Sequence, residues 1–142
     1  LCDIDGTLAD VSHRLHYVEQ EPKDWDGFFA RMSHDTVRQE TLDLVKDYLS
    51  EGFDIVFLSG RPDNYRVQTQ AWLTDRCHWE KPLVFMRRAG DHRDDVVVKA
   101  ELLQRYFPDT SLIHMVIDDR KRVLDMWARE LPHAQIINVG GE

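Results

Sequence analysis

Stretches typical of buried strands alternate with stretches typical of amphipathic helices along most of this chain. This alternation limits the possible folds more than any other feature, because strands that alternate with helices predict a mostly parallel sheet covered on both faces, with right-handed crossovers. The expected strands are 1–4, 53–58, 82–86, 112–117 and 135–139, and the expected helices are 24–33, 40–50, 65–76, 95–107 and 120–131.

The helical stretches also predict which side chains face inward. In 40–50, the apolar residues Leu42, Val45 and Leu49 share one face, and Gly52 follows as a left-handed stop. The inward residues expected in 65–76 are Val67, Ala71 and Trp72.

The chain of 142 residues, 42% of them hydrophobic, has the size and composition of one globular domain. No repeat or linker divides it, so we expect a single domain over 1–142 with a small cap or flap insertion at about 9–40. The first apolar stretch, 1–4, is shorter than the roughly 5 to 6 residues usual for a central strand. We therefore expect the chain to be a fragment that lacks upstream residues.

No apolar run approaches the roughly 18 to 20 residues that a membrane helix needs, so no membrane partner is expected. Cys2 and Cys77 suggest neither a disulfide framework nor a paired metal spacing, which favours a reducing, intracellular (cytoplasmic) location. The formal charge of −8 argues against a broad basic footprint on a nucleic-acid backbone. It does not exclude recognition of a strand end.

Polar side chains follow three of the expected strands at their carboxyl ends, where parallel sheets usually bind ligands. Acids, a hydroxyl group and cations that converge on one rim suit phosphoryl transfer, because that reaction needs charge neutralisation and positioning. The residues are Asp3 and Asp5 after the first strand, Ser59 and Arg61 after the second, and Asp118 and Asp119 after 112–117.

Each acidic pair has a second interpretation. Asp3 and Asp5 are followed by Gly6 and Thr7, which suit a tight turn, and an Asp-Gly pair also occurs in purely structural turns. Asp118 and Asp119 would repel one another at a buried rim unless a cation compensates them, and oxygen ligands without Cys or His favour Mg²⁺. Alternatively, Asp119 caps the helix that begins near Arg120.

Taken together, these residues resemble the four ordered motifs of the haloacid dehalogenase (HAD) superfamily, over nearly the whole chain. More narrowly, the sequence resembles the 3′-phosphatase domain of phage-type and bacterial polynucleotide kinase-phosphatases. The resemblance implies a HAD-like Rossmannoid three-layer sandwich with a small cap insertion. The stretches that carry it are 3–8, Arg14, 59–62, 86–88, 90–99 with Lys99, 117–120, 126–127 and 137–142.

The resemblance implies a role for each motif residue. Asp3 would be the nucleophile that forms an aspartyl-phosphate, and Asp5 would protonate the leaving oxygen and then activate water. The remaining implied roles are phosphate binding by Ser59 and Lys99, substrate binding by Arg14, Arg61 and Asp95, and Mg²⁺ binding by Asp3, the Asp5 carbonyl and Asp118 or Asp119. Val96 departs from the family pattern beside Asp95, which leaves open that Asp95 only caps the helix carrying Lys99.

The expected function is therefore that of a magnesium-dependent phosphohydrolase that removes 3′-phosphates from DNA or RNA ends. A phosphatase of nucleotides or other small molecules is the alternative, and a receiver-type or catalytically inactive module is disfavoured by the motif set. The resembled proteins often carry an upstream kinase domain, and they include phage-encoded enzymes. No Gly-x-x-x-x-Gly-Lys-Ser/Thr motif occurs in this sequence, so no kinase activity is expected of it.

Several further residues have both a functional and a structural interpretation. His13 and His16 lack further ligands for a metal, and with Arg14 they suggest a mobile loop that faces the substrate. A basic rim for a nucleic-acid end, or ordinary charged surface, is expected from Arg87, Arg88, Arg93, Lys121 and Arg122. Stacking of a base, or packing of a small cap, is expected from Trp25, Phe28 and Phe29.

Overall fold

The strands form parallel pairs that the first residues of the chain join. The structure, a computed structural model, describes residues 1–140. β3 (Phe57–Pro62) pairs in parallel with β4 (Val84–Arg87), and β5 (Met115–Asp118) pairs in parallel with β6 (Gln135–Asn138). Cys2 forms parallel bridges to Phe57 of β3 and to Ile117 of β5. The order across the strands is therefore β4, β3, residues 1–4, β5 and β6.

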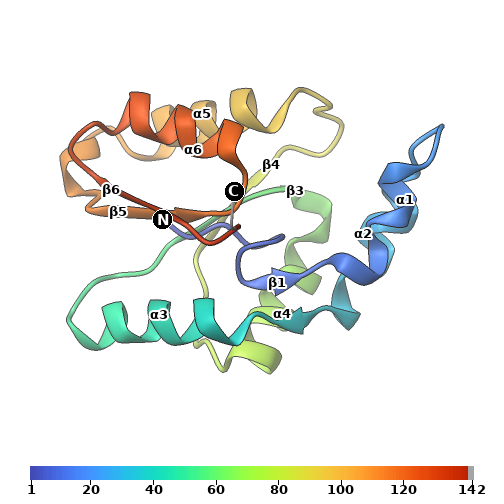
Figure 1. Ribbon diagram of the computed structural model, residues 1–142, viewed down its shortest axis with the longest axis horizontal. Coiled ribbons are helices and arrows are strands. Elements are labelled where there is room, and N and C mark those ends of the chain that lie inside the picture. The colour runs from blue at the N-terminus through green and yellow to red at the C-terminus, as the bar shows by residue number, and fades with distance from the viewer. Residues whose placement is uncertain (141–142) are drawn as a thin grey trace.

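Helices lie on both sides of these strands. Figure 1 shows α5 (Asp95–Tyr106) and α6 (Lys121–Glu130) on one side, and α3 (Gln39–Ser50) and α4 (Arg66–Cys77) on the other. The α/β arrangement expected from the alternation is thus observed, with short parallel pairings. None of the helices in residues 1–140 combines the length and the apolar character needed to cross a membrane.

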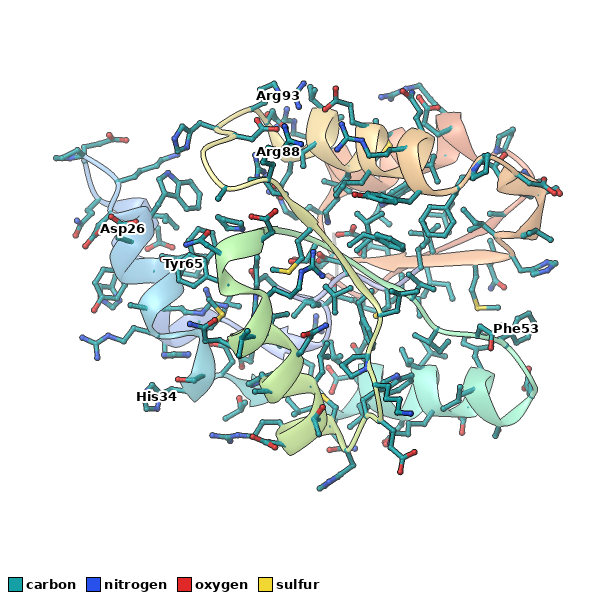
Figure 2. All side chains as sticks on the ribbon, turned by 180° about the vertical axis from the view of Figure 1, so that it is seen from behind. Asp26, His34, Phe53, Tyr65, Arg88 and Arg93 are labelled. Carbon is teal, nitrogen blue, oxygen red and sulfur yellow. The ribbon has the colours of Figure 1, made fainter. Side chains whose placement is uncertain are left out.

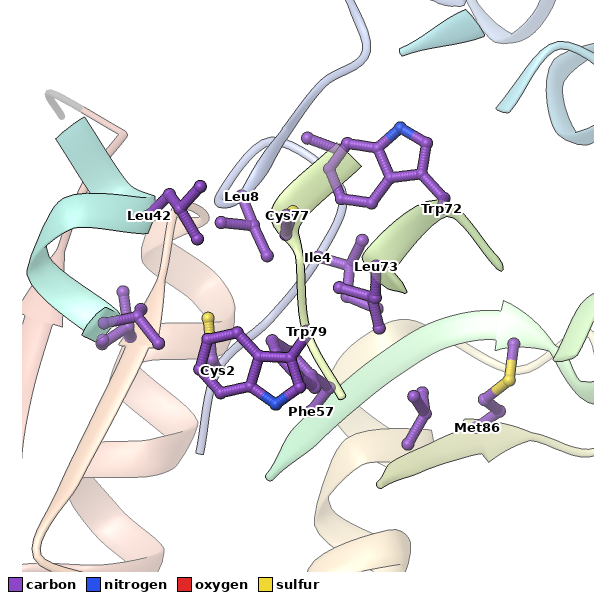
Figure 3. Close-up of a cluster of buried hydrophobic side chains, with 14 residues drawn as sticks. Cys2, Ile4, Leu8, Leu42, Phe57, Trp72, Leu73, Cys77, Trp79 and Met86 are labelled. Carbon is purple, nitrogen blue, oxygen red and sulfur yellow. The ribbon is translucent and has the colours of Figure 1, made fainter. Parts of the chain in front are cut away.

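Period-two alternation along the strands divides the apolar side chains into two cores. Phe57 and Ile117 pack with Cys2 and Ile4 against α3 and α4, in the cluster drawn in Figure 3. Their neighbours Leu58 and Val116 pack on the other side, against side chains of α5 and α6. Because Cys2 and Ile4 face α3 and α4, the intervening Asp3 and the equivalent Asp118 face α5 and α6.

An excursion of the chain leaves the strands after residue 8 and returns before α3. It is closed by a short antiparallel ladder of β1 (Ala9–Asp10) and β2 (Thr36–Val37), and in Figure 1 it projects to one side of the molecule. The excursion contains η1 (Ser12–Arg14), α1 (His16–Glu19), α2 (Trp25–Ala30) and η2 (Met32–His34), and the other 3-10 turns are η3 (Asp63–Tyr65) and η4 (Thr110–Leu112).

Three predicted segments differ from the structure in their bounds. Strand pairing in 53–58 begins only at Phe57 and continues to Pro62, and in 112–117 it begins at Met115, whereas Leu112 is 72% exposed. An apolar run shows where a strand can be buried, but its hydrogen bonds begin only where the neighbouring segment lies beside it. The single helix predicted over 24–33 is a short α-helix followed by a 3-10 turn, in which Met32 is buried beside Arg61.

The predicted inward faces of two helices are partly wrong. In α3, Leu42 and Val45 are buried as expected, but Leu49 is 43% exposed near the end of the helix. In α4, Val67 is 77% exposed, Ala71 is also exposed, and the buried side chains are Thr69, Trp72, Leu73 and Cys77. Polar contacts orient α4, because Thr69 accepts a hydrogen bond from Arg61 and the Trp72 indole donates to the Asp35 carbonyl.

Candidate active site

Three carboxylates meet where residues 1–4 and β5 end side by side. Oxygen atoms of Asp3, Asp118 and Asp119 all lie within 4.8 Å of one another. Asp3 and Asp118 are 7% and 1% exposed. Because neighbouring parallel strands end at the same edge, the sequence prediction that these residues converge is confirmed by the geometry.

Lys99 of α5 is the cation between two of these acids. Its Nζ donates to Asp3 Oδ1 over 2.9 Å and to Asp118 Oδ2 over 3.0 Å, and the side chain is 2% exposed. Burial alone would lower the pKa of Lys99, but attraction to Asp3 and Asp118 outweighs burial and raises that pKa. The Lys99 side chain is therefore a charged ammonium that lies between the carboxylates of Asp3 and Asp118.

The three acids differ in how well they are compensated. Burial tends to raise the pKa of Asp118, but Lys99, the Asp119 amide and the Trp127 indole (3.3 Å) together lower it. Burial and repulsion from Asp118 raise the pKa of Asp3 despite its contact with Lys99. Burial likewise raises the pKa of Asp119. One lysine thus does not neutralise three carboxylates. A hard divalent cation, which prefers oxygen ligands, would supply the missing positive charge.

The turn after Asp5 packs directly against Asp119. Thr7 Oγ1 lies 2.9 Å from Asp3 Oδ2 and 3.1 Å from Asp119 Oδ1, so its hydroxyl group connects the two acids. Gly6 has a φ of +80°, and a Cβ at this position would lie only 2.2 Å from Asp119 Oδ2. The glycine is therefore needed both for the turn and for the approach of Asp119.

The Asp5 side chain is not part of the three-carboxylate group. Although alternation would place Asp3 and Asp5 on one face of a continuing strand, the chain turns here and Asp5 binds two arginines. Its Oδ1 accepts hydrogen bonds from Arg14 Nη2 (2.9 Å) and Arg61 Nη2 (2.6 Å). Burial would raise the pKa of Asp5, but attraction to Arg61 and then Arg14 outweighs burial and lowers it.

Asp35, at the end of η2, is a buried acid that sequence reasoning missed. It accepts from Arg14 Nε (2.8 Å) and Nη2 (2.7 Å), from Arg61 Nη2 (3.4 Å), and pairs with His13 Nε2 (2.6 Å). Asp35 is 0% exposed. No motif marks it, and the only signal was that two site arginines require more than one carboxylate when buried.

The segment around Arg14, which is expected to be a mobile loop facing the substrate, buries this arginine inside the protein. Arg14 is 0% exposed, and its guanidinium lies 4.2 Å from the centre of the Phe28 ring. His13 is engaged by Asp35, and the His16 ring lies beside Tyr17. Burial and ion pairing therefore hold Arg14 itself within the protein.

Ser59 and Asp95 lie on neighbouring elements of the structure, in β3 and at the start of α5. Ser59 in β3 is 1% exposed, and its Oγ accepts from the Arg61 amide over 3.0 Å. Asp95, at the start of α5, binds Arg87 and Arg120. The alternative in which Asp95 caps α5 is wrong, because the cap is the adjacent Asp94, which accepts from the Val96 amide over 3.0 Å.

The alternative in which Asp119 only caps α6 is also wrong. The N-cap residue of α6 is Arg120, and no side-chain hydrogen bond caps this helix. Asp119 lines a pocket of about 260 Å³, whose other lining residues are Arg120, Lys121, Arg122 and Gly140.

Most side chains of the predicted basic rim form ion pairs within the protein, and the predicted aromatic side chains contact one another. Arg93 binds Asp91 and Glu101, Lys121 binds Asp125, and Arg122 binds Asp94. Figure 2 shows Arg88 and Arg93 along the upper edge of the molecule, whereas Tyr65 lies on the left and Phe53 on the right. In the aromatic group, Phe28 is buried, and Trp25 is 50% exposed and stacked on Phe29.

Comparisons with known proteins identify the family of the chain. Residues 1–139 match the family model described as the polynucleotide kinase PNKP phosphatase domain; Gly141 and Glu142 of the predicted closing motif lie outside the described residues. The chain is 32% identical over 141 residues to a "Putative bifunctional polynucleotide kinase/RNA ligase" of Autographa californica nuclear polyhedrosis virus. This alignment covers 98% of the chain and 19% of the viral protein.

Two solved structures have similar folds. The chain matches a protein in the "Structure of the Pnkp1/Rnl/Hen1 RNA repair complex" with a TM-score of 0.80 and 28% identity, over 97% of this chain and 40% of that one. A second match, in the "Structure of Pnkp1/Rnl/Hen1 complex", has a TM-score of 0.79 and 28% identity, over 97% and 43% of the two chains. The chain spans less than half the length of each of these relatives. It is thus a phosphatase enzyme, and it belongs to the family of the polynucleotide kinase PNKP phosphatase domain.

Proposed function

We propose that the chain is a magnesium-dependent phosphohydrolase that removes 3′-phosphates from the ends of DNA or RNA through an aspartyl-phosphate on Asp3. The convergence of Asp3, Asp118 and Asp119 around Lys99 carries the proposal. The buried Asp3 and the half-buried Asp119, both with raised pKa values beside a single lysine, suit a site that takes up both a divalent cation and a phosphate.

The cation would be held by Asp3, the Asp5 carbonyl and Asp118 or Asp119. When bound, it supplies the positive charge that lets a phosphate dianion approach the carboxylates. The donor set fits, since no Cys or His belongs to the acidic group in the described residues. The ammonium of Lys99 and the hydroxyl group of Ser59 would bind phosphate oxygens.

The reaction would then proceed in two steps on the chain's own carboxylates. An oxygen of Asp3 forms a bond to phosphorus while the bond from phosphorus to the 3′-oxygen breaks. The departing 3′-oxygen takes a proton from Asp5. Asp5 next accepts a proton from water as the water oxygen bonds to phosphorus and the bond from phosphorus to the Asp3 oxygen breaks. Inorganic phosphate leaves, and both acids return to their initial state.

The role of Arg14 and Arg61 in substrate binding stays a prediction. Both guanidinium groups are fully buried on Asp5 and Asp35, so we favour a role in holding Asp5 in place. Asp95 forms ion pairs with Arg87 and Arg120 at the edge of the site. There these two cations would face the nucleic-acid substrate beyond its terminal phosphate.

The wider setting follows from the relatives. The arrangement of helices on both sides of the strands fits the HAD-like three-layer sandwich, and the excursion at about 9–40 fits a small cap over the site. A kinase activity, named for the viral relative, would belong to a part of the full protein outside this chain. Action inside the cell stays a prediction. A phage or viral origin also stays a prediction, to which the viral relative lends support.

The test is phosphate release with and without Mg²⁺ from a 3′-phosphorylated oligonucleotide, a 3′-mononucleotide and an aryl phosphate at equal concentration. Asp3→Asn is expected to abolish release, whereas Asp125→Asn, at an exposed acid that pairs with Lys121, should retain it. Preference for the mononucleotide would move the protein to nucleotide metabolism. Full activity of Asp3→Asn would refute the covalent mechanism, and no release from any substrate would indicate an inactive module.

A further inference from the structure

Asp119 lies between two glycine-containing segments that are far apart in the sequence. A Cβ at Gly6 would lie 2.2 Å from Asp119 Oδ2, and a Cβ at Gly140 would lie 2.1 Å from the Asp119 carbonyl oxygen. The side chain of Asp119 thus packs on the turn after Asp5, and its backbone packs on the segment after β6. Its position depends on how these two segments are held.

Arg38 connects these two segments. Its Nη1 donates to the Gly6 carbonyl, and its Nη2 donates to the Val139 carbonyl over 2.8 Å. The Arg38 amide also donates to the Leu8 carbonyl over 2.8 Å, while the Val139 amide donates to the Asp118 carbonyl over 3.0 Å. The Arg38 guanidinium therefore links the two segments that pack against the backbone of Asp118 and Asp119.

The geometry of this contact suits arginine in particular. A planar guanidinium can donate to two carbonyls in fixed directions, whereas a lysine ammonium is a point charge on a flexible stem. The other partner of Arg38 is Glu40, at 3.3 Å, whose side chain is 72% exposed. An exposed ion pair of this kind contributes little to stability, so the two carbonyls account for the placement of Arg38.

We infer that Arg38 is a positioning residue that holds Asp119 at the distance from Asp3 required for the two acids to share a divalent cation. The inference rests on the proposed function of the same site, because it concerns the affinity for that cation. Arg38 does not touch the acids themselves. It acts through Gly6 and Val139, and no sequence motif drew attention to it.

Magnesium binding tests this inference without reference to catalysis. Titration calorimetry on the wild type, Arg38→Ala, Arg38→Lys and Glu40→Gln gives the affinity of each protein for Mg²⁺ alone. Removing a group that orients metal ligands typically weakens binding by about 10-fold or more. We expect this loss for Arg38→Ala, a value nearer to Arg38→Ala than to the wild type for Arg38→Lys, and a change within about twofold for Glu40→Gln.

Steady-state kinetics give a second readout. For Arg38→Ala, kcat should recover towards the wild-type value as Mg²⁺ is raised, with KM for the phosphate substrate unchanged at saturating Mg²⁺. A lower melting temperature with unchanged Mg²⁺ affinity would show a merely structural role and overturn the inference. If Arg38→Ala does not fold, the Arg38→Lys affinity decides in the same way. Absence of Mg²⁺ binding by the wild type would instead overturn the proposed function, and the inference with it.

Discussion

At the residue scale, the carboxylates of the site contribute unequally to stability. Asp118 has a lowered pKa, so its contribution is present above the unfolded-state pKa and is lost as the pH falls through the lower folded-state value. Asp3 has a raised pKa, so folding is opposed as the pH rises from its unfolded-state pKa through the folded-state value. In the absence of a cation, ionisation of Asp3 therefore costs the fold stability.

Substitutions at these two acids should have opposite effects on the metal-free protein. Asp3→Asn removes a desolvated charge that Asp118 repels, and although it also weakens the contact with Lys99, it should raise the free energy of unfolding by about 1 kcal/mol. Asp118→Asn breaks a buried pair with Lys99 and should lower it by about 3 kcal/mol. Urea unfolding at neutral pH in the presence of a chelator measures both. Equal destabilisation by the two changes would contradict this account of Asp3.

Asp5 predicts a specific pH dependence. Its lowered pKa means that the acidic form needed to protonate the leaving oxygen is lost as the pH rises through that value. Arg61→Gln removes the stronger of the two attractions and should move the alkaline limb of kcat/KM to higher pH. Lys121→Gln, which loses an exposed pair with Asp125 and leaves the partners of Asp5 in place, is the control. A limb that does not move in Arg61→Gln would exclude Asp5 as its source.

The sequence was most informative for residues whose partners are dictated by chemistry at a strand end. Asp3, Lys99, Asp118 and Asp119 were predicted together and converge in the structure. Asp35 was not predicted, because its arginine partners lie 21 and 26 positions away and no pattern connects them. Burial of charge depends on the full three-dimensional packing, which local patterns do not contain.

At the element scale, helices were located better than strands. The predicted bounds of the helix at 95–107 differ from α5 by one residue, because Asp94 caps its start and apolar spacing marks its length. The strand predicted at 53–58 is displaced towards its carboxyl end, since pairing depends on where residues 1–4 and 82–86 lie. Strand ends are thus set by contacts distant in the sequence.

The end of α4 offers an independent test of element stability. His78, the residue that ends this helix, has the left-handed values φ 56° and ψ 38° and an exposed side chain. Because a left-handed conformation costs a residue with a Cβ about 1–2 kcal/mol, His78→Gly should raise the melting temperature by about 3 °C.

The matched control for His78→Gly is Gly52→Ala after α3. Gly52 has a φ of +99°, and a Cβ there would meet nothing within 4 Å. Any loss of stability in Gly52→Ala would therefore come from the backbone conformation alone. Calorimetric melting temperatures of both variants check the pair of predictions. A lower melting temperature for His78→Gly would show that its side chain makes a stabilising contact.

At the scale of the whole molecule, charge limits how the protein can bind a nucleic acid. The formal charge is −8, and rim cations such as Arg93, Arg120 and Arg122 are paired with acids. We therefore expect contact with only one or two phosphates besides the one that is cleaved. The slope of log kcat/KM against log salt concentration for a single strand should be about −1. A slope of about −4 or steeper would indicate a basic binding surface.

Residues 1–4 lie between two strands that come much later in the chain, and the Leu1 nitrogen donates to the Met115 carbonyl, 114 positions away. During synthesis on a ribosome, this segment emerges before either of its neighbours in the sheet. It gains its second neighbour only when β5 has been made. The contact order of the sheet is correspondingly high, and such pairings form slowly. Asp3 thus reaches its place beside Asp118 only late in folding, so catalytic competence should be among the last properties that a newly made chain acquires.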